Sequence, residues 1–199
     1  MKKMTGEKFI SLIEKDPSWC LCIKEPIEIT TFVNLSYGNI THLSPLLTFS
    51  GKNEDNWVAN FYECENLKVA TGTFHGFVHF GYSGIEKIEN LNVTETDKVN
   101  ESTSFSNCQN LKVATGNYKG RVNFSNSGVT TIKNLNIKAP DNYGEKAHFL
   151  NCPILYIPKE YRGKEYIFNK KIIEKSILKD KITKEAINII KSEANNIEI

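Results

Sequence analysis

Apolar and polar positions along the chain recur in one arrangement at an offset of 44 residues. Residues 61–93 (FYECENLKVATGTFHGFVHFGYSGIEKIENLNV) and 105–137 (FSNCQNLKVATGNYKGRVNFSNSGVTTIKNLNI) are identical at 18 of 33 positions without a gap. A third copy begins at Phe149 with FLNCPILYIP, and VNLSYGNITHLSPL at 33–46 shares the apolar positions of 78–91. Self-similarity at a fixed period of this length is typical of repeat proteins, in which each copy packs on its neighbours.

Each 44-residue copy divides into two related halves, which we call half-repeats. One reads F-x-x-C-x-x-L and the other reads [FL]-x-x-[SG]-[GN]-[IV]-x-x-[IL]. The leading apolar residues of six successive half-repeats are Leu35, Phe61, Phe80, Phe105, Phe124 and Phe149. From Phe61 onward they are 19, 25, 19 and 25 residues apart. A segment of about 22 residues cannot bury its own apolar face, so the half-repeats are predicted to stack into a solenoid.

The two half-repeats resemble the bacterial BspA-type leucine-rich repeat, whose units carry F-x-x-C-x-x-L-x-x-I-x-I-P and the variant F-x-x-S-G-L-x-x-I. FLNCPILYIP (149–158) and FGYSGIEKI (80–88) are close to those two forms, and the resemblance covers roughly three quarters of the chain. It implies an α/β repeat solenoid, a stack of short parallel strands and turns. It also implies a surface that binds other proteins, as is usual in that family, whose members are often displayed or secreted by bacteria and protists.

Helical caps are predicted at both ends, because the ends of a solenoid expose apolar surface. Residues 1–19 form the predicted N-terminal cap, in which Thr5 can cap a helix over residues 6–15. Residues 20–168 form the predicted solenoid. Residues 169–199 form a predicted C-terminal helical cap that is rich in lysine.

Three of the five cysteines, Cys64, Cys108 and Cys152, occupy the same repeat position. They fall on alternate half-repeats, so their backbones are expected to lie on the order of 10 Å apart. That separation is too large for a disulfide and does not let the three thiols converge on one zinc ion. We therefore predict small buried side chains at turns and no metal site. Cys20 and Cys22, in the sequence WCLC, are predicted to pack within the N-terminal cap.

Composition and charge narrow the function classes. The formal net charge is +2, and no window approaches the roughly 18 apolar residues that cross a bilayer. The first residues lack the apolar core of a secretory signal, so a cytoplasmic chain is expected. Near neutrality and the scarcity of arginine argue against nucleic acid as a partner. The chain has no nucleophile elbow, H-E-x-x-H or G-x-G-x-x-G pattern, so neither catalysis nor a cofactor is predicted.

Positions that differ between the two closest copies are predicted to be exposed, since the fold does not require them. Strand alternation directs Val78 and Phe80 inward and therefore Phe77 and His79 outward, unless a loop covers Phe77. Trp57, in the polar connection 50–57, is a further aromatic that can pack down as an anchor. The predicted partner-binding cluster consists of His75, Phe77, His79, Tyr82 and Arg121.

These patterns predict a non-catalytic protein–protein interaction module of the leucine-rich-repeat type. A structural or self-assembling repeat protein is the first alternative, with homo-oligomers formed through exposed strand edges. The second alternative is an enzyme or a nucleic-acid binder that uses the basic C-terminal helices; there, acidic residues are interspersed among the lysines.

Overall fold

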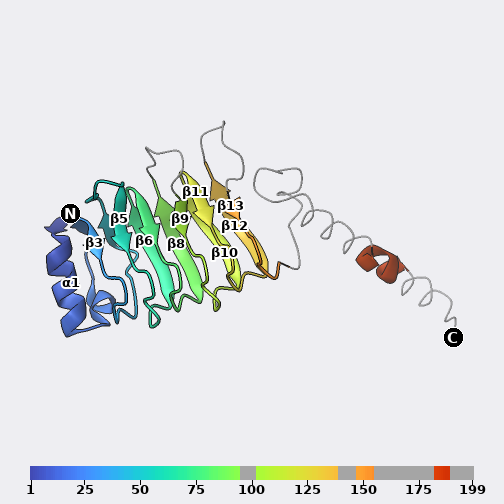
Figure 1. Ribbon diagram of the computed structural model, residues 1–199, viewed down its shortest axis with the longest axis horizontal. Coiled ribbons are helices and arrows are strands. Elements are labelled where there is room, and N and C mark those ends of the chain that lie inside the picture. The colour runs from blue at the N-terminus through green and yellow to red at the C-terminus, as the bar shows by residue number, and fades with distance from the viewer. Residues whose placement is uncertain (95–101, 139–146, 155–181, 189–199) are drawn as a thin grey trace.

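Two parallel β-sheets form the framework of the computed structural model, which describes residues 1–94, 102–138, 147–154 and 182–188. From β2 to β13 the chain enters the other sheet at each successive strand, so each sheet collects every second strand in chain order. Figure 1 shows the strands side by side in a row that begins next to helix α1. The predicted short parallel strands joined by turns are therefore confirmed.

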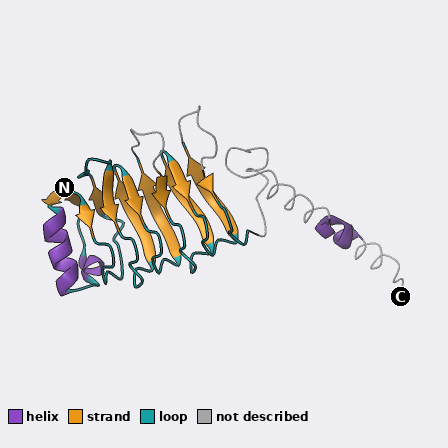
Figure 2. Ribbon diagram, in the orientation of Figure 1, coloured by secondary structure: helices purple, strands orange, loops and turns teal. Residues whose placement is uncertain are grey.

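The two sheets differ in strand length. The seven-stranded sheet has the order β1 (Lys2–Met4), β2 (Ile27–Ile29), β4 (Leu47–Phe49), β6 (Val69–Phe74), β8 (Lys87–Val93), β10 (Val113–Tyr118) and β12 (Thr131–Ile137). The six-stranded sheet consists of β3 (Val33–Asn34), β5 (Trp57–Asn60), β7 (Phe77–His79), β9 (Ser102–Ser104), β11 (Arg121–Asn123) and β13 (Ala147–His148). All of these pairings are parallel, as Figure 2 shows for both sheets.

A column of phenylalanine rings runs through the core. Each ring belongs to the residue that directly follows a strand of the six-stranded sheet and leads a half-repeat. Successive rings lie 5.1 to 5.4 Å apart between centroids, with planes within 15° of parallel. The column consists of Phe61, Phe80, Phe105, Phe124 and Phe149, all at most 4% exposed. The spacing of 19 and 25 residues thus marks the positions at which the chain returns to one column.

The repeated cysteines connect one half-repeat to the one before it. Cys64 Sγ donates to the Leu35 carbonyl oxygen at 3.1 Å, Cys108 Sγ to that of Phe80 at 3.0 Å, and Cys152 Sγ to that of Phe124 at 2.9 Å. Burial raises the pKa of Cys64 to about 12 and that of Cys108 to about 11, which keeps both thiols protonated as donors. The predicted buried structural role is confirmed for Cys64 and Cys108, and Cys152 is half-buried.

Helix α1 (Gly6–Lys15) lies at the N-terminal end of the sheets. The Thr5 side chain caps it by accepting from the Lys8 backbone N–H at 3.3 Å. Phe9 and Ile13 are buried, and the Phe9 ring meets Phe49 edge-on at 5.7 Å. The helix predicted over residues 6–15 is confirmed.

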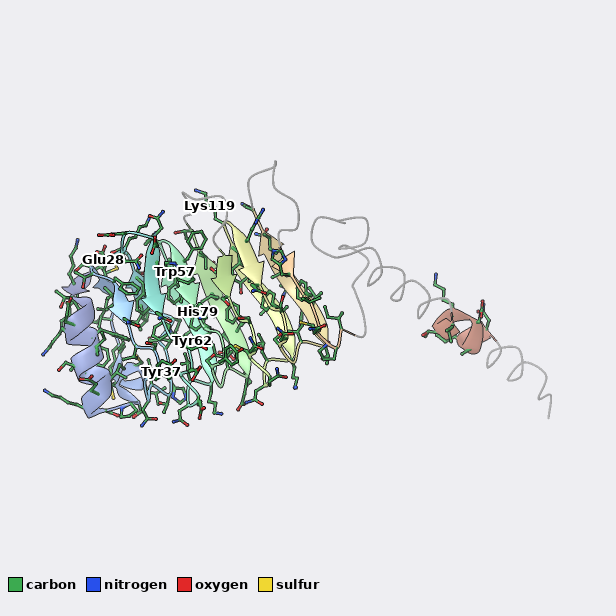
Figure 3. All side chains as sticks on the ribbon, in the orientation of Figure 1. Glu28, Tyr37, Trp57, Tyr62, His79 and Lys119 are labelled. Carbon is green, nitrogen blue, oxygen red and sulfur yellow. The ribbon has the colours of Figure 1, made fainter. Side chains whose placement is uncertain are left out.

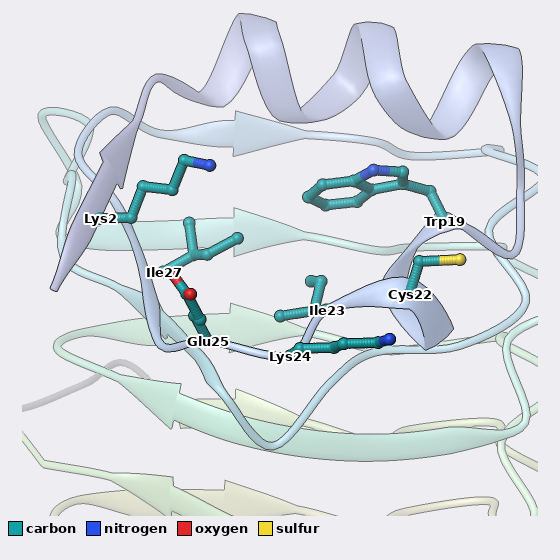
Figure 4. Close-up of a pocket in the computed structure, with 7 residues that line it drawn as sticks. All are labelled: Lys2, Trp19, Cys22, Ile23, Lys24, Glu25 and Ile27. Carbon is teal, nitrogen blue, oxygen red and sulfur yellow. The ribbon is translucent and has the colours of Figure 1, made fainter.

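The prediction for the WCLC segment is correct for one cysteine and wrong for the other. The segment forms a 3₁₀ helix (Trp19–Cys22) in which Cys20 is buried and Cys22 is exposed. A single tight turn places the two thiols on different sides of the backbone. Figure 4 shows Cys22 at the rim of a recess lined also by Lys2, Lys24 and Glu25.

At the C-terminal end, residues 182–188 are helical and exposed. The remainder of the predicted cap over 169–199 lies outside the described residues, as does the chain from 155 to 168. None of the helices in the described parts is long and apolar enough to cross a membrane.

Candidate functional site

Five aromatic side chains form a continuous group on the outer face of the six-stranded sheet. We call this group, Tyr37, Trp57, Tyr62, His79 and Tyr82, the aromatic strip. The Tyr62 ring is central: it lies 5.7 Å from Tyr37, 5.4 Å from Tyr82 and 5.2 Å from His79 between centroids. His79 in turn lies 5.6 Å from Trp57. Figure 3 shows Trp57, His79, Tyr62 and Tyr37 one below another along the strand direction.

Strand alternation places His79 on this outer face. Ala59 and Val78, which are paired across β5 and β7, belong to the buried core, so their neighbours Asn60 and His79 point the other way. His79 Nδ1 accepts a hydrogen bond from the Gly81 backbone N–H at 3.1 Å. Burial lowers the pKa of His79. The neutral ring therefore carries its proton on Nε2, as assigned from this hydrogen bond.

The acceptor at this position is a repeated feature of the sheet. In five half-repeats, the residue before the leading apolar residue carries a side-chain acceptor that receives the backbone N–H two residues further on. The acceptors are Asn34, Asn60, His79, Ser104 and Asn123. The sequence contains this signal, since only Asn, His and Ser occupy the position. Our sequence analysis did not use it.

Tyr37 and Tyr82 occupy a backbone conformation that disfavours large side chains. Their φ angles are 60° and 57°, in the left-handed region. The equivalent turn residues of other half-repeats are Asn107, Asn126 and Asn151, with φ of 62°, 57° and 59°. Asparagine tolerates this region, whereas other L-residues lose about 1–2 kcal/mol there. Tyr37 is 70% exposed and Tyr82 is 50% exposed, so burial in the core does not offset that cost.

Phe77 is covered, which settles the alternative left open by the sequence. It points away from the core, but it is only 1% exposed and packs against Trp57 with ring centroids 6.2 Å apart. The preceding connection lies against it, because the Phe77 backbone N–H donates to the Asn56 carbonyl at 3.1 Å. The Phe77 ring is therefore not an exposed member of the predicted cluster. It instead packs beside that of Trp57.

Two other predicted residues lie outside the aromatic strip. His75 sits between β6 and β7, where its Nδ1 lies 2.8 Å from Thr94 Oγ1. Arg121 begins β11, which β9 separates from β7 in the sheet. Of the predicted cluster, His79 and Tyr82 therefore belong to the aromatic strip, and His75 and Arg121 do not. Arg121 lies apart because equivalent positions of the two copies are two strands apart in the sheet.

Tyr37 and Tyr62 were not predicted as site residues. Tyr37 could have been found, because VNLSYGNI (33–40) aligns with VHFGYSGI (78–85) and places Tyr37 opposite Tyr82. Tyr62 belongs to the other kind of half-repeat, in which its neighbour Glu63 takes the left-handed position with φ of 55°. The Tyr62 side chain reaches the strip from one residue earlier, so alignment of half-repeats does not reveal it.

We found no protein-family model, no curated protein and no solved structure that matches this chain. Among the described residues, no group of three or more His, Cys, Asp or Glu side chains is placed to hold a metal ion. The aromatic strip itself offers ring faces together with hydroxyl, indole and imidazole donors. Ring faces can pack against a ligand, and the donors can form hydrogen bonds with it.

Proposed function

We propose that this chain is a non-catalytic protein–protein interaction module, a leucine-rich-repeat-like solenoid of the BspA type, and that the aromatic strip binds its partner. The observation that carries the proposal is the pair of exposed tyrosines at left-handed turn positions. Backbone strain that does not serve packing is characteristic of functional sites. Exposed tyrosine and tryptophan are the residue types that carry much of the binding energy at protein interfaces.

Rigidity of the underlying sheet supports the same proposal. Trp57 and His79 of the strip lie on β5 and β7, whose side chains Val58, Ala59 and Val78 are fully buried, and the three tyrosines lie in the turns that follow β3, β5 and β7. Side chains held on paired strands lose little conformational entropy on binding, so more of the contact energy remains as affinity. The five free cysteines favour action in a reducing compartment such as the cytoplasm.

The test compares the wild type with the double variant Tyr37→Asn/Tyr82→Asn. Asparagine is native at the equivalent turns, so the substitution removes both rings and retains the backbone. The matched control is Thr48→Asn, at a half-exposed position of the seven-stranded sheet. Each chain would be used as bait in a native lysate, with quantitative mass spectrometry of the captured proteins.

We expect partners captured by the wild type and by Thr48→Asn to fall by about tenfold with the double variant. Circular dichroism of all three chains establishes that they are folded. Equal capture by the double variant and the wild type would contradict the proposal.

A further inference from the structure

We infer that the aromatic strip binds an extended, proline-rich and basic segment of its partner, an assignment that rests on the binding function proposed above. Four observations support it: the dimensions of the strip, its hydrogen-bonding groups, the charge of its surroundings and the angles between its rings.

The dimensions fit a short polyproline II helix. From Trp57 through His79 and Tyr62 to Tyr37, successive ring centroids lie 5.6, 5.2 and 5.7 Å apart, so the strip is at most about 16 Å long. A polyproline II helix rises about 3.1 Å per residue, so about five residues span this distance. At its lower end the strip meets a recess of about 400 Å³. Tyr37 lines this recess together with Leu35 and with Ile10, Ile13 and Glu14 of α1.

The hydrogen-bonding groups of the strip are mainly donors. The hydroxyls of Tyr37 and Tyr82, the indole N–H of Trp57 and Nε2–H of His79 can all donate. A proline-rich backbone lacks N–H groups but presents carbonyl oxygens that no intramolecular bond occupies. Donor-bearing aromatic surfaces are therefore complementary to it, as in other domains that recognise polyproline helices.

The acidic residues around the strip favour a basic partner segment. The three stretches that build the strip, 33–43, 53–67 and 77–86, contain no lysine or arginine, although the whole chain has a net charge of +2. They contain the five acidic residues Glu54, Asp55, Glu63, Glu65 and Glu86, of which Glu86 forms an ion pair with Lys68 at 3.2 Å. A hydrogen bond to Glu63 raises the pKa of Tyr62 to about 12, which places a carboxylate directly at the centre of the strip. Complementary potentials favour a cationic partner segment.

The rings of the aromatic strip are steeply inclined to one another. Tyr62 meets Tyr37 at 79°, Tyr82 at 64° and His79 at 68° between ring planes. Rings set at these angles do not form one flat platform. Tilted rings instead expose both faces and edges, between which the compact rings of proline pack.

The experiment measures fluorescence anisotropy of a labelled peptide, eight prolines flanked by one arginine at each end, titrated with the full chain. One control peptide replaces the arginines by glutamates, and another replaces the prolines by alternating serine and glycine. We expect both control peptides to bind about tenfold more weakly. The Tyr37→Asn/Tyr82→Asn variant should also lose about tenfold in affinity, and Thr48→Asn should match the wild type.

Absence of binding by the arginine–proline peptide, or equal affinity of the wild type and the double variant, would overturn the inference. The lysate capture described above separates this failure from failure of the proposed function. If capture depends on Tyr37 and Tyr82 while the peptide does not bind, the strip is a binding site for a different class of segment. If capture is also independent of both tyrosines, the proposed function fails as well.

Discussion

At the scale of single residues, Tyr82 combines a strained backbone with a half-exposed ring, and the two can be separated by mutation. Tyr82→Asn retains the turn and relieves the left-handed conformation. We expect the free energy of unfolding to rise by about 1 kcal/mol, measured by urea denaturation. The reverse substitution Asn126→Tyr, at the equivalent position, should cost a similar amount. A less stable Tyr82→Asn variant would show that contact with Tyr62 outweighs the strain.

Thr103 contains a buried hydroxyl that has no hydrogen-bond partner among the described residues. The corresponding inward positions of neighbouring strands carry Val78 and Val122. Thr103→Val keeps the shape and removes the desolvated oxygen, so we expect a gain of about 1 kcal/mol in the free energy of unfolding. Thr48→Val, at a half-exposed site, should change stability by less than about 0.5 kcal/mol. Equal effects of the two substitutions would argue that Thr103 Oγ1 is satisfied.

At the scale of elements, the turns that follow the strands of the six-stranded sheet lie against the preceding half-repeat. A Cβ atom added at Gly84 would lie 1.8 Å from the Glu65 carbonyl oxygen, and the Gly84 backbone N–H donates to the Cys64 carbonyl at 3.1 Å. We expect Gly84→Ala to lower the free energy of unfolding by about 1–3 kcal/mol, because the turn must move away from its neighbour.

The first half-repeat provides the control for this prediction. Asn39 is exposed at the equivalent position, and the helix α1 replaces a preceding half-repeat there. Asn39→Ala removes one exposed hydrogen bond, which Asn39 Oδ1 accepts from Asn66 Nδ2 at 2.6 Å, so the midpoint of urea unfolding should fall by less than it does for Gly84→Ala. A Gly84→Ala variant as stable as the wild type would contradict the predicted close contact between half-repeats.

The same comparison of elements explains what the sequence could predict. Features that recur with the period, such as the inward ring of Phe80 and the buried thiol of Cys108, are visible in the sequence and were predicted. The cover over Phe77 was left open, because it comes from the connection 50–57, whose sequence is not repeated. The strip around Tyr62 was missed for a related reason: it joins side chains from different repeat positions on β5, on β7 and in the turns that follow β3, β5 and β7.

At the scale of the whole molecule, the buried thiols link stability to pH. Cys64 and Cys108 are fully buried, and desolvation raises their pKa from 9.0 to about 12 and about 11. Below pH 9 the two thiols stay protonated in both the folded and the unfolded chain, so their full contribution to the free energy of unfolding is present. As the pH rises above 9, the unfolded chain releases them first, so the free energy of unfolding falls until the folded pKa is reached.

Each such thiol adds a slope of up to about 1.4 kcal/mol per pH unit between the two pKa values. We expect the urea midpoint of the wild type to fall from pH 9 to 11, and the Cys64→Ala/Cys108→Ala variant to show a shallower decline from a lower starting stability. Cys22→Ala, which removes an exposed thiol, should keep the wild-type slope. Parallel declines of the wild type and the double variant would show that the two thiols do not hold their protons in the folded state. The donor bonds from each thiol to the preceding half-repeat would then no longer account for the cysteine in the repeat.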